Sequence, residues 1–127
     1  MGEGEGRASI EALRDVKLSK HRKAMLLSYL RLISERLGVE EVYVFGSRVY
    51  GEPLRESDLD MLVVSRQFEG LGFIRSMEEL SKLWGGDFTI EVFPYTPQQV
   101  EEYRDKKVVV AEALKRGIKI ELKPKGS

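Results

Sequence analysis

The sequence predicts an α/β domain with a small mixed β-sheet flanked by helices. Short apolar runs of strand length alternate along the chain with segments in which apolar residues recur at helical period. The 127 residues suit one domain with a sizeable core. A hydrophobic content of 42% and a charged content of 33% are typical of a globular chain, and not of a disordered or membrane-embedded one.

The domain is expected to occupy residues 9–122. Residues 1–8 are rich in Gly and Glu and are predicted to form a flexible leader, and residues 123–127 a short tail. No run of 18 apolar residues occurs, and the first residues lack the basic and apolar regions of a secretion signal. We therefore expect no membrane span and a cytoplasmic location.

The first half of the chain predicts one long helix and two strands. Apolar residues spaced by three and four between Ser19 and Leu37 predict a helix, which Gly38 ends. Residues 9–18 are either a separate short helix or the first part of this one. Val42–Phe45 and Leu59–Val64 are apolar on both faces, which favours central strands that are covered on both sides.

The second half predicts two more helices and two more strands. One helix is indicated by the spacing from Phe73 to Trp84, and Phe88–Phe93 follows as a strand. Thr96, Pro97 and Gln99 form the capping signature of a further helix, which is expected to continue to Gly117. From Ile118 to Leu122 apolar and charged residues alternate, as in a half-exposed edge strand.

Composition excludes several kinds of chemistry. Cys is absent and His21 is the single histidine, so thiol nucleophiles, Cys-ligated metals and a Ser-His triad are excluded or very improbable. Lys plus Arg and Asp plus Glu each number 21, and this zero net charge lacks the basic footprint of a duplex-DNA binder. The remaining chemistry is chiefly that of carboxylates, hydroxyls, Arg and Lys.

A candidate phosphate site lies where the first strand ends. Gly46 permits a close backbone approach, and the Ser47 hydroxyl with free N–H groups could hold a phosphate, assisted by Arg48. Taken alone, a strand followed by Gly-Ser is also a common turn without function.

Three carboxylates form a candidate metal site. Asp58 and Asp60, two residues apart on a strand, point to one face with their Cα atoms about 7 Å apart. Such a pair suits Mg²⁺ or Mn²⁺, although both could simply be solvated at the mouth of the strand. Glu91, flanked by Ile90 and Val92, is expected to need a partner, either the same metal or an ordinary ion pair.

The pattern Gly46-Ser47, ten residues, Asp58-x-Asp60 on an apolar strand resembles the signature of the DNA polymerase β-type nucleotidyltransferases. The resemblance is greatest to the minimal nucleotidyltransferases, which often act as antitoxin partners of HEPN-domain proteins, and it extends over residues 20–122. It implies the polymerase β-like nucleotidyltransferase fold. It further implies that Gly46 and Ser47 bind the terminal phosphates of the nucleotide, with Arg48 and Gly51 assisting.

The resemblance also implies that Asp58, Asp60 and the acid on the third strand bind two Mg²⁺ ions, or Mn²⁺. Glu91 stands where the family usually has Asp, and its extra methylene moves the carboxylate by about 1.3 Å, a displacement that can lower activity ~10²-fold.

The implied function is metal-dependent transfer of a nucleoside monophosphate, AMP from ATP, to a hydroxyl on a HEPN toxin. Two alternatives remain open: an inactive antitoxin that acts by complex formation, and an enzyme that modifies a small molecule through a composite site in a homo-oligomer.

Overall fold

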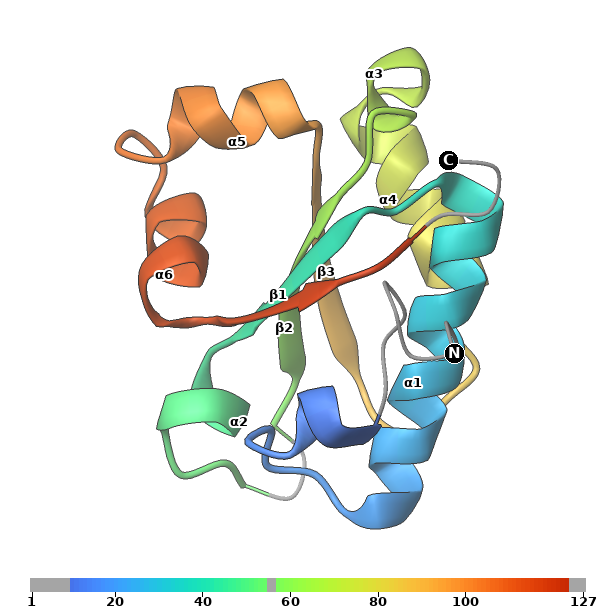
Figure 1. Ribbon diagram of the computed structural model, residues 1–127, viewed down its shortest axis with the longest axis vertical. Coiled ribbons are helices and arrows are strands. Elements are labelled where there is room, and N and C mark those ends of the chain that lie inside the picture. Colours follow the sequence, from blue (N-terminus) through green and yellow to red (C-terminus); the bar gives the residue numbers. More distant parts are fainter. Residues whose placement is uncertain (1–9, 55–56, 124–127) are drawn as a thin grey trace.

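The computed structural model describes residues 10–54 and 57–123 (Figure 1). The predicted leader and most of the predicted tail lie outside these residues. Helices and strands alternate along the chain, as the sequence predicted. In order, the elements are η1 (Ile10–Leu13), α1 (Lys20–Leu37), β1 (Glu41–Phe45), α2 (Ser47–Tyr50), β2 (Leu59–Val64), α3 (Phe68–Leu71), α4 (Phe73–Lys82), β3 (Ile90–Tyr95), α5 (Pro97–Tyr103), α6 (Val108–Arg116) and β4 (Ile118–Glu121).

The four strands form one mixed sheet in the order β3-β2-β1-β4. β1 is antiparallel to both β2 and β4, whereas β2 and β3 are parallel. β4 lies at one edge, as its alternating sequence predicted. β3 lies at the other edge, where Pro94 is tolerated because an edge strand pairs on one side only.

Helices cover both faces of the sheet (Figure 1). Because successive strand residues point to opposite faces, β2 contributes Leu59, Met61 and Val63 to the core beneath α1 and α4, and Leu62 and Val64 to the core beneath α5 and α6. The central strands β1 and β2 are therefore covered on both sides, as expected. No helix in the described part of the chain is long and apolar enough to span a membrane.

α1 has the predicted boundaries. The Ser19 side chain accepts a hydrogen bond from the Arg22 amide at 3.1 Å, and Gly38 ends the helix at φ 63° with its N–H on the Ile33 carbonyl. The preceding segment is a separate short 3₁₀-helix, η1, which decides between the two alternatives left open above.

Two predicted elements differ from the structure. The third strand begins at Ile90 instead of Phe88, because the Trp84 indole N–H binds the Phe88 carbonyl at 2.9 Å and holds it in the preceding loop. The helix predicted from Pro97 to Gly117 is two helices, because the backbone at Lys107 is extended (φ −114°, ψ 130°).

Candidate active site

Two acidic residues meet at the same end of neighbouring strands. Asp60 pairs with Phe45 in β1 on one side and lies beside Glu91 in β3 on the other. Asp60 shares a face with Leu62 and with the core beneath α5 and α6, and Glu91, in register with it, lies on that face too. The structure therefore brings Asp60 and Glu91 together, on adjacent parallel strands.

The electrostatics of this pair are unfavourable without a cation. Partial burial raises the pKa of the Asp60 carboxyl to about 6, and the Glu91 charge, a hydrogen bond with Glu91 and the Asp58 charge add to the rise. Glu91 itself is exposed. The prediction that its carboxylate is buried, and therefore needs a partner, is wrong. What brings Glu91 to the site is its register with Asp60.

The oxygen ligands of Asp60 and Glu91 are of the kind that binds a divalent cation, but the described residues do not bring a third ligand of this kind close to them. All donors are carboxylate oxygens, the ligands that Mg²⁺ and Mn²⁺ prefer, and a cation would relieve the repulsion that raises the pKa of Asp60. Asp58 is exposed, and within residues 10–54 and 57–123 no three acidic or histidine side chains converge closely enough to hold a metal ion. Metal binding by Asp58, Asp60 and Glu91 stays a prediction.

Gly46 lets the turn after β1 pack directly against Asp60. Its φ of 90° is a conformation that L side chains rarely adopt. A Cβ atom at this position would lie 2.5 Å from Oδ2 of Asp60. Only glycine therefore satisfies both the backbone and the contact, and the turn and the carboxylates form one site.

Ser47 begins the short helix α2, and Gly51 follows its end. The Gly51 amide donates to the Ser47 carbonyl at 3.1 Å, and a Cβ atom on Gly51 would lie 3.0 Å from Cα of Ser47. Gly51 thus closes the turn by a tight backbone approach. Ser47 is half-buried, and the first N–H groups of such a turn have no partner within it.

Arg48 holds the loop around the turn together. It is only 5% exposed, and its guanidinium donates to the carbonyls of Ser57 (3.1 Å), Lys17 (2.9 Å) and Leu54 (3.5 Å). In return, the Lys17 amide donates to the Arg48 carbonyl and the Lys17 ammonium to that of Gly51. These contacts do not favour the phosphate contact predicted for Arg48, which stays a prediction. Lys17 takes part in these contacts. It was not predicted as a site residue, because no motif in the sequence around it indicates this role.

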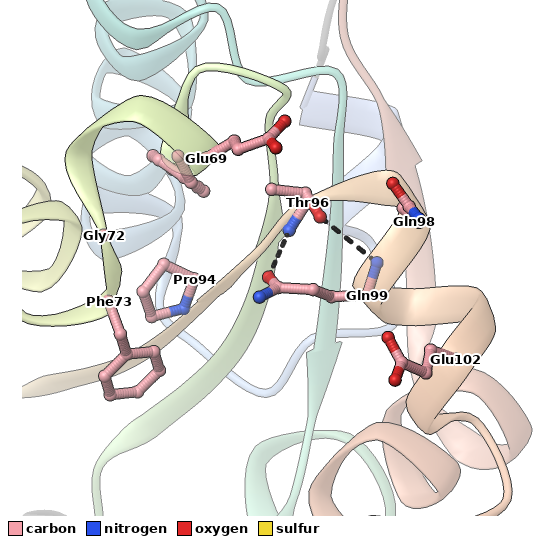
Figure 2. Close-up of a pocket in the computed structure, with 9 residues that line it drawn as sticks. Glu69, Gly72, Phe73, Pro94, Thr96, Gln98, Gln99 and Glu102 are labelled. Atoms are coloured by element: carbon pink, nitrogen blue, oxygen red, sulfur yellow. Dashed lines mark hydrogen bonds between the residues drawn. The ribbon is translucent and has the colours of Figure 1, made fainter.

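A separate cavity of about 190 Å³ lies at the other end of β3 (Figure 2). It is lined by residues of α3, α4 and α5 and by Pro94 and Thr96, whereas Glu91 lies near the opposite end of the strand. Figure 2 also shows the predicted capping box, in which the Thr96 amide donates to the Gln99 side chain and the Gln99 amide to the Thr96 hydroxyl. This cavity is not part of the candidate active site.

Ser47→Ala separates a phosphate ligand from a simple helix-start residue. If the hydroxyl meets a charged oxygen, ATP affinity is expected to fall by about 1–3 kcal/mol while stability barely changes. A residue that only caps the turn would give the reverse, with stability lower by about 1 kcal/mol and affinity unchanged. Calorimetric titration and thermal melting of the same variant distinguish the two.

The raised pKa of Asp60 predicts a metal-sensitive pH dependence. The Asp60 carboxyl binds its proton more tightly in the folded protein than in the unfolded chain. The protonated carboxyl therefore contributes to stability near pH 4, and this contribution is lost as the pH rises through about 6. Relative to Asp60→Asn, metal-free wild type should therefore lose stability over that range. Mg²⁺ should raise its melting temperature, more at pH 8 than at pH 5 where protons compete. A response that persists in the Asp58→Asn/Asp60→Asn double variant would place the metal elsewhere.

Fold and site together define a class of protein. It is a small α/β domain in which a Gly-Ser turn suited to phosphate lies against strand carboxylates suited to a divalent cation. Residues 27–125 match the nucleotidyltransferase domain family, and the chain belongs to that family. The resemblance noted from the motif is thereby confirmed.

Two individual proteins are similar to the chain. Protein adenylyltransferase MntA of Thermococcus cleftensis is 39% identical over 64 residues, which are 50% of this chain and 65% of that protein. A protein of Sulfolobus solfataricus, whose crystal structure is described as that of a candidate nucleotidyltransferase, is 26% identical. That comparison covers 84% of this chain and 86% of the other, with a TM-score of 0.45.

Proposed function

We propose that the protein transfers AMP from ATP to a hydroxyl group of a partner protein. The observation that carries this proposal is the contact between Gly46 and Asp60, which joins the turn predicted to bind phosphate to the carboxylate pair Asp60 and Glu91. Family membership supports nucleotidyl transfer, and the relative from Thermococcus cleftensis is by name a protein adenylyltransferase. In this reaction the acceptor oxygen bonds to the α-phosphorus, and pyrophosphate leaves.

The residues divide this work between two sides of the site. The turn at Gly46 and Ser47 binds the terminal phosphates and so orients the α-phosphorus. Asp60 and Glu91, with Asp58, would hold two Mg²⁺ ions, which when bound activate the acceptor hydroxyl and stabilise the leaving pyrophosphate. Gly51 closes the turn, and the guanidinium of Arg48 holds it in place by hydrogen bonds to backbone carbonyls.

The acceptor is proposed to be a protein. This choice rests on the similarity to the protein adenylyltransferase of Thermococcus cleftensis. A HEPN toxin encoded beside this protein is the partner that the family resemblance implies, and the chain would then be its antitoxin, silencing it by adenylylation. The experiment is incubation with α-labelled ATP, Mg²⁺ and the co-encoded protein. Label on that protein supports the proposal.

Two other outcomes would replace it. Label on a small hydroxyl compound alone would make the chain a small-molecule nucleotidyltransferase. A stable complex without label would make it an antitoxin that acts by binding. The Glu at position 91, where the family usually has Asp, is the feature that favours this last alternative.

Changes at Glu91 separate an active site from a degenerate one. If Glu91 is a working metal ligand, Glu91→Gln should lower transfer by at least ~10²-fold and leave ATP binding at the turn largely intact. Glu91→Asp should lower transfer if the site is adapted to the longer side chain, because the carboxylate falls short of the metal. A gain of activity in Glu91→Asp would show a degenerate site.

A further inference from the structure

Besides Arg48 and Lys17, a further cationic group lies beside the turn that is proposed to bind phosphate. The Arg116 guanidinium, at the last residue of α6, is placed 3.8 Å from the centroid of the Tyr50 ring. Tyr50 is the last residue of α2, the short helix that begins at Ser47. Arg116 is exposed, and among the residues that the structure describes it has no carboxylate partner.

The end of α6 is fixed close to the turn by backbone contacts. A Cβ atom on Gly117 would lie 3.0 Å from the carbonyl oxygen of Val44, and Ile118 pairs with Val44 in the sheet. Val44 precedes Gly46 by two residues. The turn from α6 into β4 thus lies next to the chain that passes from β1 into α2 (Figure 1).

The Tyr50 ring is a fixed platform for the guanidinium. It packs against the core that contains Tyr43 and Phe45, and its hydroxyl is buried with no hydrogen-bond partner in the described part of the chain. The ring is therefore held by packing and not by its hydroxyl. A cation at the C-terminal end of a helix is favourable whatever the direction of its side chain, and the neighbouring Lys115 already supplies one at the end of α6. Arg116 differs from Lys115 in that its guanidinium stacks on the Tyr50 ring.

The charges around the turn indicate what Arg116 would bind. Asp60 and Glu91 flank the turn on the side of β2 and β3, and Arg116 flanks it on the side of β4. A nucleoside triphosphate carries most of its negative charge on the β- and γ-phosphates, and a planar guanidinium can bind such oxygens with two parallel hydrogen bonds. The guanidinium of Arg48 is already engaged with three backbone carbonyls.

We propose that Arg116, held on the Tyr50 ring, binds the β- and γ-phosphates of the nucleotide and so selects triphosphates over monophosphates. This inference rests on the proposed function, because it assumes that the Gly46–Ser47 turn holds a nucleotide. Arg116 contacts the leaving group, and Tyr50 acts through Arg116 as a positioning residue.

The test is calorimetric titration of ATP and AMP, each with Mg²⁺, into wild type and Arg116→Gln. Arg116→Gln should bind ATP at least ~10-fold more weakly, as expected for the loss of a charge-assisted hydrogen bond, and AMP within about 2-fold of wild type. The matched control is Lys115→Gln, which removes the same charge from the same helix end without the stack. It should bind ATP within about 2-fold of wild type.

Two further variants test the stack itself. Tyr50→Leu keeps the cation and removes the platform, so it should weaken ATP binding and spare AMP. Arg116→Lys keeps the charge and loses the planar group, and it should bind ATP with an affinity between those of wild type and Arg116→Gln.

The outcomes separate this inference from the proposed function. If wild type binds neither nucleotide, the proposed function fails. If wild type prefers ATP and Arg116→Gln keeps that preference, the inference about Arg116 alone is overturned. Equal losses for ATP and AMP, together with a lower melting temperature, would also overturn it, because they would show a purely structural role.

Discussion

Asp60→Asn is expected to lower nucleotidyl transfer by at least ~10³-fold, within the range for groups that act on reacting atoms. Asp60 is the residue at which the site converges, because it contacts Gly46 and lies beside Glu91. Asn has almost the same shape and lacks the charge, so the fold should persist. At pH 8 the metal-free variant should even melt higher than wild type, since an ionised carboxylate no longer faces Glu91 and Asp58.

Steady-state transfer and thermal melting at pH 8 check this expectation. Asp105→Asn is the matched control, because Asp105 is an exposed aspartate in the turn between α5 and α6. It should leave transfer and melting temperature unchanged. Transfer by Asp60→Asn within 10-fold of wild type would mean that the reaction centre lies elsewhere.

Gly46→Ala is expected to abolish transfer and to destabilise the fold. A non-glycine residue at φ 90° costs about 1–3 kcal/mol, and the new methyl group would also lie 2.5 Å from the Asp60 carboxylate. Either the turn or Asp60 must move, and both belong to the candidate site. We expect a lower melting temperature and loss of ATP binding, measured by thermal melting and calorimetry.

Gly70→Ala provides the control for this change. Gly70 lies in α3, and a Cβ atom there would meet no heavy atom within 4 Å. The substitution should leave ATP binding unchanged and should not lower stability, because alanine is the better helix former. If Gly46→Ala behaved like Gly70→Ala, the turn would not be packed against Asp60 as described.

The sheet could be predicted because its strands are specified locally. Apart from Asp60, Leu59–Val64 is apolar on both faces and bounded by polar residues, and it forms β2 with the predicted boundaries. β3 began two residues late because the Trp84 indole holds the Phe88 carbonyl, a contact that local pattern does not reveal. The break at Lys107 was missed for a related reason: apolar spacing continues across it, from Tyr103 to Val110.

The candidate site was predictable where its residues follow one another closely. Gly46, Ser47, Asp58 and Asp60 fall within 15 residues, and their spacing alone pointed to phosphate and metal chemistry. That Glu91 lies beside Asp60 depends on the register of β2 with β3, and its exposure could not be inferred from its apolar neighbours. Arg116 is 66 residues from Tyr50, so only the folded chain shows that they meet.

The reciprocal hydrogen bonds between Arg48 and Lys17 tie the segment before α1 to the turn that begins at Gly46. Breaking them would release the carbonyls of Leu54 and Ser57 as well, so the backbone on both sides should open as one unit. In hydrogen exchange, the amides of Lys17 and Gly51 should therefore exchange at matched rates, although the sequence separates them by 34 residues. A partner protein that binds residues 14–19 would slow this local opening. It would thereby stabilise the turn that begins at Gly46 without contacting it.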